Sequence, residues 1–498
     1  MKKIIILLSI TCIAYNSCSL DTIPTDRYVE SSFWINEQQL NAGLTACYNS
    51  LRHENMYGGL ASAVYSETIT PNAYMYDNTS GFGVIGKGTH TPSNSSVING
   101  KWGKCYEGIG RCNTFLEQVV NFELDKVKKN QMIGEVQFLR AFYYFELINY
   151  YGDAPLILES PNIDTQKDLP RDSKDELITQ VLADLAEATS LLPPSYSSSN
   201  DEGRPSAWAA WGLIARVHLY NSNWQEAENA AKKIMDSGQF SLYPNYREIF
   251  ARDNEGNSEV LFDIQFLNPN FNHSIDLIMR QYNTCAPLLD LVKAYDMNDG
   301  SPYDDNKPLY DNRDPRFYQT IIYPGTTYMG IPVGDDRFKF TGYTFIKFSV
   351  YDTEYIQEYD WNDINYIYMR YADVLLMFAE ARNERLGSPD AEVYNALNLI
   401  RERETVKMPI FDIAKNYSKE QMRQMIRHER RIELAGEGLY YNDIRRWGIA
   451  KDVMNGPIYK YDNSLIETRV FQDKDYLWPI PETQTRENPS LLPNNPGW

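Results

Sequence analysis

Cysteine and histidine are scarce in this chain, which holds 6 cysteines and 5 histidines in 498 residues. No two cysteines form a CxxC pair or a zinc-type spacing, so neither a disulfide framework nor a cysteine–metal cluster is predicted. The histidines stand singly along the sequence, which argues against a histidine-based metal site. Composition therefore predicts no metal cofactor.

Long hydrophobic runs are also missing. The N-terminal apolar run, Ile4–Ile13, is shorter than the ~20 residues that a membrane-spanning helix needs. It follows two lysines, as the hydrophobic part of a secretory signal does. Small and polar residues then lead to Cys18, which is typical of a bacterial lipoprotein: residues 1–17 are the signal, Cys18 carries the lipid, and 18–35 form a tether. The alternative is an ordinary cleaved signal with an incidental cysteine.

Positive charge is in short supply, because 48 Lys and Arg face 67 Asp and Glu and give a net charge of -19. Such an acidic chain repels a phosphate backbone, so nucleic acid is not an expected partner. The same charge disfavours strongly anionic ligands unless a local basic pocket reverses it.

Tyrosine is abundant, with 37 residues in a chain that is 13% aromatic. A tyrosine ring joins an apolar face to a polar hydroxyl, and sugar rings present the same mixture of C–H faces and hydroxyl edges. We interpret tyrosines inside helices as core residues and those in loops as candidates for ligand contact.

Helical periodicity and capping signals recur along the chain. In two of the helix pairs, an alanine of the first helix precedes one of the second by 12 residues (Ala215 and Ala227, Ala379 and Ala391). Small residues there favour close antiparallel packing, as in tetratricopeptide units of ~34 residues. The expected helices and helix pairs cover 36–52, 95–120, 131–151, 173–194, 206–238, 371–403 and 418–438.

Two segments, 68–100 and 253–361, are rich in Gly, Pro, Asn, Asp and Tyr. The second contains short strand-like runs, EVLFDIQF and YTFIKFSVY. Loops this long inside a compact domain are uncommon and are usually functional or disordered. Their tyrosines favour a function.

Five motifs occur in order along the chain: EVQFLRAFYYFELINYYGDAPLI, NRDPRF, MRYADVLLMFAEARNE, RHERRIELAGEGLYYNDIRRWG and LWPIPETQTRENPSLLPNNPGW. Together with the cysteine-ended leader they resemble the SusD/RagB family of surface glycan-binding lipoproteins. The family often has a basic residue where Tyr440 stands, and the residues before Cys18 depart from its usual pattern.

The resemblance implies a mostly α fold with a few short strands, in one domain over 36–498. Tetratricopeptide-like helix pairs would form the scaffold, long irregular loops would project from it, and a C-terminal strap would cross it. The implied scaffold segments are about 36–67, 94–240 and 365–450, with ligand loops at about 68–100 and 253–361 and the strap at 470–498.

The resemblance also implies a function. Family members are held on the outer membrane by their lipid alone and face the cell exterior. They capture oligosaccharides, pass them to a SusC-like TonB-dependent outer-membrane barrel, and catalyse nothing.

The charged residues of the motifs are expected to lock helices together through charge pairs. The residues read in this way are Arg140, Glu146, Glu429, Arg430, Arg431, Glu433, Asp443, Arg445 and Arg446. The strap is expected to bury Trp478 and Trp498.

The ligand-binding loops of the family share no motif, so the resemblance identifies no ligand-contacting residue. The candidate contacts are therefore the aromatic and polar residues of the two loop regions. The first region offers Asn72, Tyr74, Tyr76 and Asp77, with Asn78 alongside; the second offers Tyr282, Tyr303, Tyr328 and Trp361, with Tyr355 and Tyr359. Alternation places Tyr74 and Tyr76 on one side of an extended segment. A weaker expectation is a structural Ca²⁺ among Asp304, Asp305, Asp311 and Asp314.

Two alternatives stay open. A glycoside hydrolase would need two carboxylates about 5–10 Å apart, and no motif indicates such a pair. A lipoprotein of the same architecture could import peptides, in which case changes on the helical face rather than in the loop tyrosines would abolish binding.

Overall fold

Helices form about half of this protein and strands only a small part, as the sequence predicts. The computed structural model describes residues 33–59, 62–196, 198, 201–334, 337–349 and 362–498. The main helices are α3 (Glu37–Asn49), α6 (Ser96–Val119), α7 (Lys126–Tyr151), α9 (Lys174–Leu191), α10 (Ala207–Tyr220), α11 (Trp224–Asp236), α15 (Tyr371–Arg385), α16 (Ala391–Arg401), α17 (Lys419–Glu433) and α18 (Tyr440–Arg446). Shorter helices are α4 (Ser62–Tyr65), α5 (Phe82–Lys87), α8 (Ile163–Gln166), α12 (Ile275–Leu277), α13 (Leu289–Ala294), α14 (Pro315–Tyr318), α19 (Ala450–Met454) and α20 (Glu482–Glu487).

Local capping explains where several helices begin. Ser173 and Glu176 form the predicted capping box at the start of α9, and Ser418 does the same for α17. Helix α7 begins earlier than predicted, at Lys126, because the Asp125 side chain accepts the N–H groups of the next turn. A charged first turn carries no hydrophobic periodicity, so the sequence pattern missed it.

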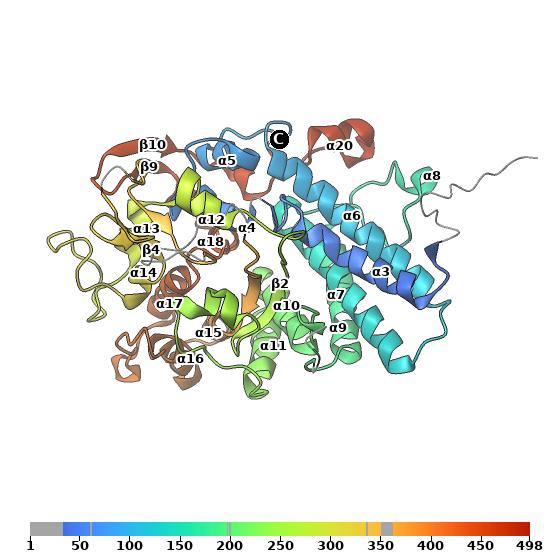
Figure 1. Cartoon of the computed structure of the whole chain (residues 1–498), viewed down its shortest axis with the longest axis horizontal. Coiled ribbons are helices and arrows are strands. Elements are labelled where there is room, and N and C mark those ends of the chain that lie inside the picture. Colours follow the sequence, from blue (N-terminus) through green and yellow to red (C-terminus); the bar gives the residue numbers. More distant parts are fainter. Residues whose placement is uncertain (1–32, 60–61, 197, 199–200, 335–336, 350–361) are drawn as a thin grey trace, which may run out of the picture.

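Successive helices pack as neighbours: α6 against α7, α7 against α9, α10 against α11, and α15 against both α11 and α16. Figure 1 shows these helices on the right and along the bottom of the view, with the loop-rich part around α13, α14, β9 and β10 at the upper left. Ala215, Ala227 and Ala379 are fully buried, as their spacing predicts. The expectation for Ala391 is wrong, because it opens α16 on the surface and Ala396 is buried instead.

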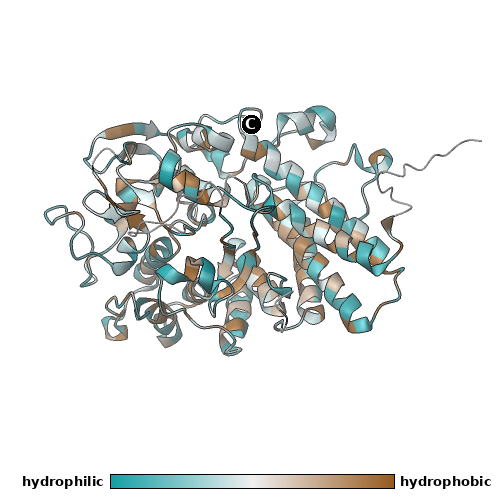
Figure 2. Ribbon diagram, viewed as in Figure 1, coloured by the Kyte–Doolittle hydropathy of each residue, from teal (hydrophilic) through white to brown (hydrophobic). Residues whose placement is uncertain are grey.

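Most buried apolar side chains form one continuous cluster that runs from Leu40 in α3 to Leu491 near the C-terminus, and a second, small cluster lies around β5 and β6. Hydrophobic residues gather along α7, α9 and α10 in the interior (Figure 2). Among the described residues, no helix combines the length and apolar character needed to cross a bilayer.

Most charged residues of the motifs lie inside the protein and form charge pairs between elements, as expected. The expectation for Arg445 is wrong, because it donates to backbone carbonyls and to Asn442 rather than to a carboxylate. Arg140 of α7 forms a bidentate pair with Asp184 of α9, with N–O distances of 2.8 and 2.7 Å. The further buried pairs are Lys101–Glu146, Arg316–Glu429, Arg401–Glu429, Arg370–Glu433, Arg430–Asp443 and Arg446–Glu380. These contacts hold helices together rather than form an exposed acid–base site.

Strands are short and occur in antiparallel pairs. The pairs are β1 (Ala73–Tyr74) with β3 (Ala286–Pro287), β2 (Val260–Ile264) with β8 (Tyr366–Arg370), β4 (Ile321–Ile322) with β7 (Thr344–Phe345), β5 (Thr327–Tyr328) with β6 (Ile331–Pro332), and β9 (Gly456–Tyr459) with β10 (Leu465–Arg469). Segment 68–100 is less irregular than expected, since it holds β1, α5 and the first turn of α6.

The C-terminal segment crosses the helical scaffold and is fixed by backbone hydrogen bonds. The Trp478 N–H donates to the Tyr150 carbonyl at 2.7 Å, and the Asn495 amide donates to the Tyr151 carbonyl at 2.8 Å. Trp478 is buried as predicted, with 1% of its surface exposed. Trp498 is only half-buried, because it lies at the chain end over Lys474.

Candidate ligand-binding site

A two-residue β-ladder joins the two loop segments that the sequence keeps far apart. Tyr74 pairs with Ala286 and Ala73 with Pro287, and the Leu288 N–H donates to the Asn72 carbonyl at 2.9 Å. This pairing brings the first tyrosine-rich loop against the second.

Two aromatic side chains stack at the surface beside this ladder, and a third is exposed nearby. The rings of Tyr76 and Phe340 stack with their centroids 3.7 Å apart and their planes 11° apart. Tyr282, 49% exposed, ends the helical turn that follows α12. Tyr282 comes four residues before β3, the strand that pairs with β1. Partial burial, then Asp77 and Tyr282, raise the pKa of Tyr76. We call Tyr76, Phe340 and Tyr282 the aromatic platform.

Sequence reasoning missed Phe340. The alternation of Phe338 and Phe340 in a loop rich in glycine and charge could have indicated it, but of the aromatic residues only tyrosine and tryptophan were considered as loop contacts. Phe338 turns into a small buried cluster, while Phe340 stays half-exposed and supports Tyr76.

Polar side chains flank the platform on the β1 side. Both Asp77 carboxylate oxygens accept from Thr79, one from its N–H at 3.0 Å and one from its hydroxyl at 2.8 Å. The exposed Asn78 accepts the Val84 N–H at 2.9 Å. These bonds fix two groups that can accept hydrogen bonds from sugar hydroxyls beside an aromatic face.

Alternation along β1 places its side chains as predicted. Met75 is buried, while Tyr74 and Tyr76 on either side of it are half-exposed. Tyr74 lies beside β10, where burial and then Glu467 raise its pKa. It therefore borders the platform without joining the Tyr76 stack.

The expectation that Asn72 contacts ligand is wrong, because the residue is 0% exposed. Its amide donates to Glu67 at 2.8 Å and its carbonyl oxygen accepts from Arg431 Nε at 2.8 Å. Asn72 thus acts as a buried anchor for the strand that carries Tyr74.

Tyr328 is also wrongly placed among the ligand contacts, since it too is 0% exposed. It packs with Phe338, 5.9 Å between ring centroids, inside the small cluster around β5 and β6. For Asn72 and Tyr328 alike, the position in a loop did not reveal that the residue is buried.

Four residues named from the sequence lie outside the described residues: Trp361, Tyr355, Tyr359 and Cys18.

Tyr303 belongs to a second aromatic group rather than to the platform. Its ring centroid lies 4.3 Å from the Arg313 guanidinium carbon, and its hydroxyl donates to the Lys307 carbonyl at 3.3 Å. Nearby, Tyr310 and Tyr323 have centroids 4.4 Å apart, with the exposed Tyr318 at the edge.

The acidic loop expected to hold Ca²⁺ does not gather its carboxylates. Asp314 is buried against Arg316 at 2.7 Å, and Asp305 pairs with Lys293 at 2.6 Å. Asp304 accepts from the backbone and side chain of Asn306. No group of three or more metal-ligating side chains is found in the described part of the chain.

Two carboxyl groups beside β2 have raised pKa values. Burial raises the pKa of Glu255 to about 7 and that of Asp263 to about 6. Glu255 accepts the Asn365 N–H at 2.7 Å, and Asp263 accepts from Gln265 Nε2 at 2.6 Å. Both line one surface pocket, which makes them a candidate carboxyl pair for the hydrolase alternative.

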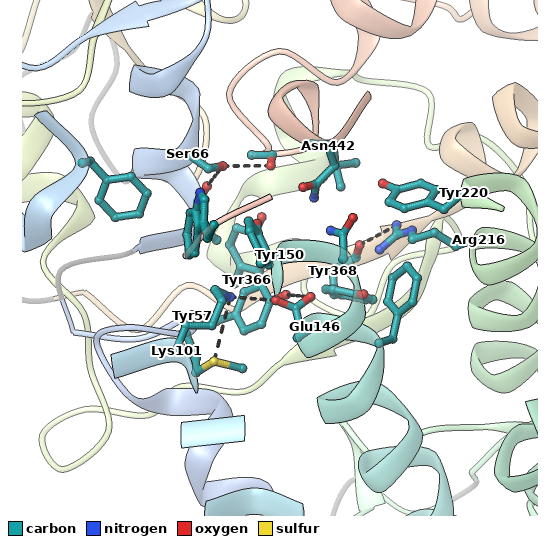
Figure 3. A pocket seen from close by; sticks show the side chains of 18 residues that line it. Tyr57, Ser66, Lys101, Glu146, Tyr150, Arg216, Tyr220, Tyr366, Tyr368 and Asn442 are labelled. Carbon is teal, nitrogen blue, oxygen red and sulfur yellow. Dashed lines mark hydrogen bonds and ion pairs between the residues drawn. The ribbon is translucent and has the colours of Figure 1, made fainter. Parts of the chain in front are cut away.

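A narrow interior pocket lies where α7 meets the loop before β1 and the start of α18 (Figure 3). Lys101 Nζ and Glu146 Oε2 lie 2.7 Å apart, and the Tyr57 hydroxyl donates to the same carboxylate at 2.9 Å. The cavity measures about 30 Å³, room for about one water molecule. This size excludes it as a site for a sugar.

Comparison with known proteins first defines the class. A SusD-like carbohydrate-binding protein from Bacteroides fragilis has a crystal structure that matches this fold with a TM-score of 0.85 at 27% identity, over 92% of this chain and 99% of that one. A SusD-like protein of Formosa agariphila is 26% identical over 95% of this chain and 94% of its own length. The starch-binding protein SusD of Bacteroides thetaiotaomicron is 29% identical, over 31% of this chain and 28% of its own length.

Family models extend the match across the chain. The model described as "SusD family" matches residues 249–498, and the one described as "Starch-binding associating with outer membrane" matches residues 14–219. The chain therefore belongs to the SusD family of carbohydrate-binding proteins associated with the outer membrane, as its motifs predict.

Proposed function

We propose that this protein binds an oligosaccharide or polysaccharide at the cell surface and delivers it to a SusC-like TonB-dependent outer-membrane transporter. In this proposal Cys18 carries the lipid anchor, the protein faces the cell exterior, and it performs no catalysis.

The aromatic platform is the observation that carries the proposal. A stacked Tyr76–Phe340 pair with an exposed Tyr282 beside it offers ring faces for sugar C–H groups. Asp77 and Asn78 lie next in sequence to Tyr76 and offer oxygen and amide groups for hydroxyls. The names of the relatives from Bacteroides thetaiotaomicron and Bacteroides fragilis support a carbohydrate ligand.

Calorimetric titration of residues 19–498 against neutral and acidic polysaccharides tests the proposal. We expect saturable binding to one class of glycan, and about tenfold or greater weakening in Tyr76→Ala, because losing an aromatic face costs about 1–2 kcal/mol or more.

A matched control is Tyr417→Ala, which removes a half-buried tyrosine that stacks on Tyr394 in the helical part of the chain. It should bind as wild type does. Equal weakening in both variants, or an unchanged affinity in Tyr76→Ala, would show that the platform is not the site.

Binding of peptides with no binding of any glycan would move the assignment to peptide import. Hydrolysis is checked on the bound glycan itself by following new reducing ends over time. We expect no new reducing ends, either with wild type or with Glu255→Gln. Reducing ends that appear with wild type and not with Glu255→Gln would establish an enzyme.

A further inference from the structure

A cavity of about 600 Å³ lies between the helical scaffold and the C-terminal segment, away from the aromatic platform. Its walls come from the C-terminal end of α7, the first turn of α9, the end of α10, α18, and residues 493–496. None of its lining residues belongs to the platform. The volume is in the range of small-molecule sites, about 300–1,000 Å³.

Three cationic side chains on this wall have no carboxylate partner among the described residues. Arg171 donates to the Asn495 amide oxygen at 2.8 Å and to the Pro493 carbonyl at 2.6 Å. Arg445 donates to carbonyls at 3.0 and 2.9 Å and to the Asn442 amide oxygen at 2.9 Å. The Lys174 ammonium has no hydrogen-bond or ion-pair partner in the described structure, while its backbone N–H donates to Asp153.

Two of the lining residues also carry a polar atom that is buried behind the cavity surface. Arg445 is 8% exposed, and within the described part of the chain its Nε–H has no acceptor. The buried Tyr220 hydroxyl oxygen is likewise without a hydrogen-bond partner there. Figure 3 shows Tyr220 and Asn442, which the small interior pocket and this cavity share, on the same side of the pocket.

Negative charge does not balance these groups. Arg446 is paired with Glu380 and Asp443, so it is neutralised. Asp153 is the acidic residue among those that line the cavity, and one of its oxygens accepts the Lys174 N–H at 2.8 Å. Partial burial lowers the pKa of Lys174; Asp175 and Asp153 raise it in part, and the Arg445 charge lowers it. In a chain with a net charge of -19, an excess of positive charge at one cavity is unusual.

We propose that this cavity binds an oxyanion, namely the carboxylate, sulfate or phosphate group of a molecule of one to two sugar rings in size. Lys174 and Arg171 would hold the anionic group at the mouth, and Arg445 would add positive potential at the wall. The site is separate from the platform, so a ligand there does not depend on the proposed function.

Titration calorimetry of residues 19–498 tests the site with four probes at constant ionic strength: D-glucuronate, inorganic sulfate, inorganic phosphate and D-glucose. We expect saturable binding of at least one anion and none of glucose. The arms separate a sugar acid from a free inorganic anion. Lys174→Gln should weaken the binding at least about tenfold, because it removes a charge-assisted contact and leaves the fold intact.

The control is Lys167→Gln, which removes the same charge from an exposed lysine at the end of α8 that makes no contact with the cavity. It should keep wild-type affinity, and so should Tyr76→Ala. Absence of binding for every anion, or equal weakening in Lys174→Gln and Lys167→Gln, would overturn the proposal.

Discussion

A single buried carboxyl group holds the strand that leads to the platform. Glu67 accepts from the Asn72 amide and from the Gly438 N–H, both at 2.8 Å, and so joins the loop before β1 to the segment before α18. Burial raises the pKa of Glu67 to about 7. The sequence shows a glutamate near a loop, but neither its burial nor its partner far along the chain.

The raised pKa sets the sign of a pH effect. An unfolded glutamate titrates near pH 4.3, so between about pH 4 and pH 7 the folded protein holds a proton that the unfolded chain releases. Stability from this group is therefore greatest at low pH and falls as pH rises through about 7.

Glu67→Gln removes this dependence. From pH 5 to pH 8 the free energy of unfolding of the wild type should fall by about 2–3 kcal/mol more than that of the variant. Urea unfolding at the two pH values measures the difference. The exposed Glu123→Gln should show no such change, and parallel pH curves for Glu67→Gln and wild type would refute the assignment.

Between elements, the contact of α7 with α9 depends on a buried ion pair. Arg140 Nη2 and Asp184 Oδ1 lie 2.7 Å apart, and Arg140 also donates to Asn113 of α6 at 3.0 Å. Both helices were predictable from periodicity and caps. The sequence predicted that charged residues of the motifs pair between helices. It did not predict which residues pair, because the partners lie on separate helices.

Arg140→Leu should lower the free energy of unfolding by about 3–5 kcal/mol, since it leaves Asp184 charged and buried without its partner. The double change Arg140→Leu with Asp184→Leu should recover most of the loss, because no charge then stays buried. Urea unfolding measures both. Lys128→Gln breaks the exposed pair with Glu37 and should cost less than about 1 kcal/mol. A double variant as unstable as the single one would show that packing, not charge, holds α7 to α9.

Short strands mark the limit of prediction at this scale. β1 and β3 have two residues each, and Phe345 of β7 lies in a run that the sequence reads as a longer strand. Pairs this short are stabilised by tertiary contacts rather than by their own propensity. The sequence therefore indicated which loops hold tyrosines, while the structure shows which of those tyrosines meet.

For the whole molecule, composition predicted the sign of the charge but not its distribution. The net charge of -19 argued against anionic ligands, yet Arg171, Lys174 and Arg445 meet at one cavity. They come from a loop, the first turn of α9, and α18, so no run of basic residues announces them. A global charge thus sets solubility and long-range attraction, and a local one sets binding.

Attachment to the membrane is likewise a property of the whole chain, and it should depend on one thiol. In the proposed function the lipid on Cys18 supplies the anchor. Cys18→Ala should lose incorporation of labelled palmitate and leave the outer-membrane fraction, because removing the acyl chains removes roughly 0.8 kcal/mol of membrane affinity for each buried CH₂. Cys12→Ala is the matched control, a cysteine inside the apolar run, and it should label and fractionate as wild type does. A wild type without label, together with Cys18→Ala that stays in the membrane pellet, would contradict the anchor and favour a cleaved signal, with attachment through protein contacts alone.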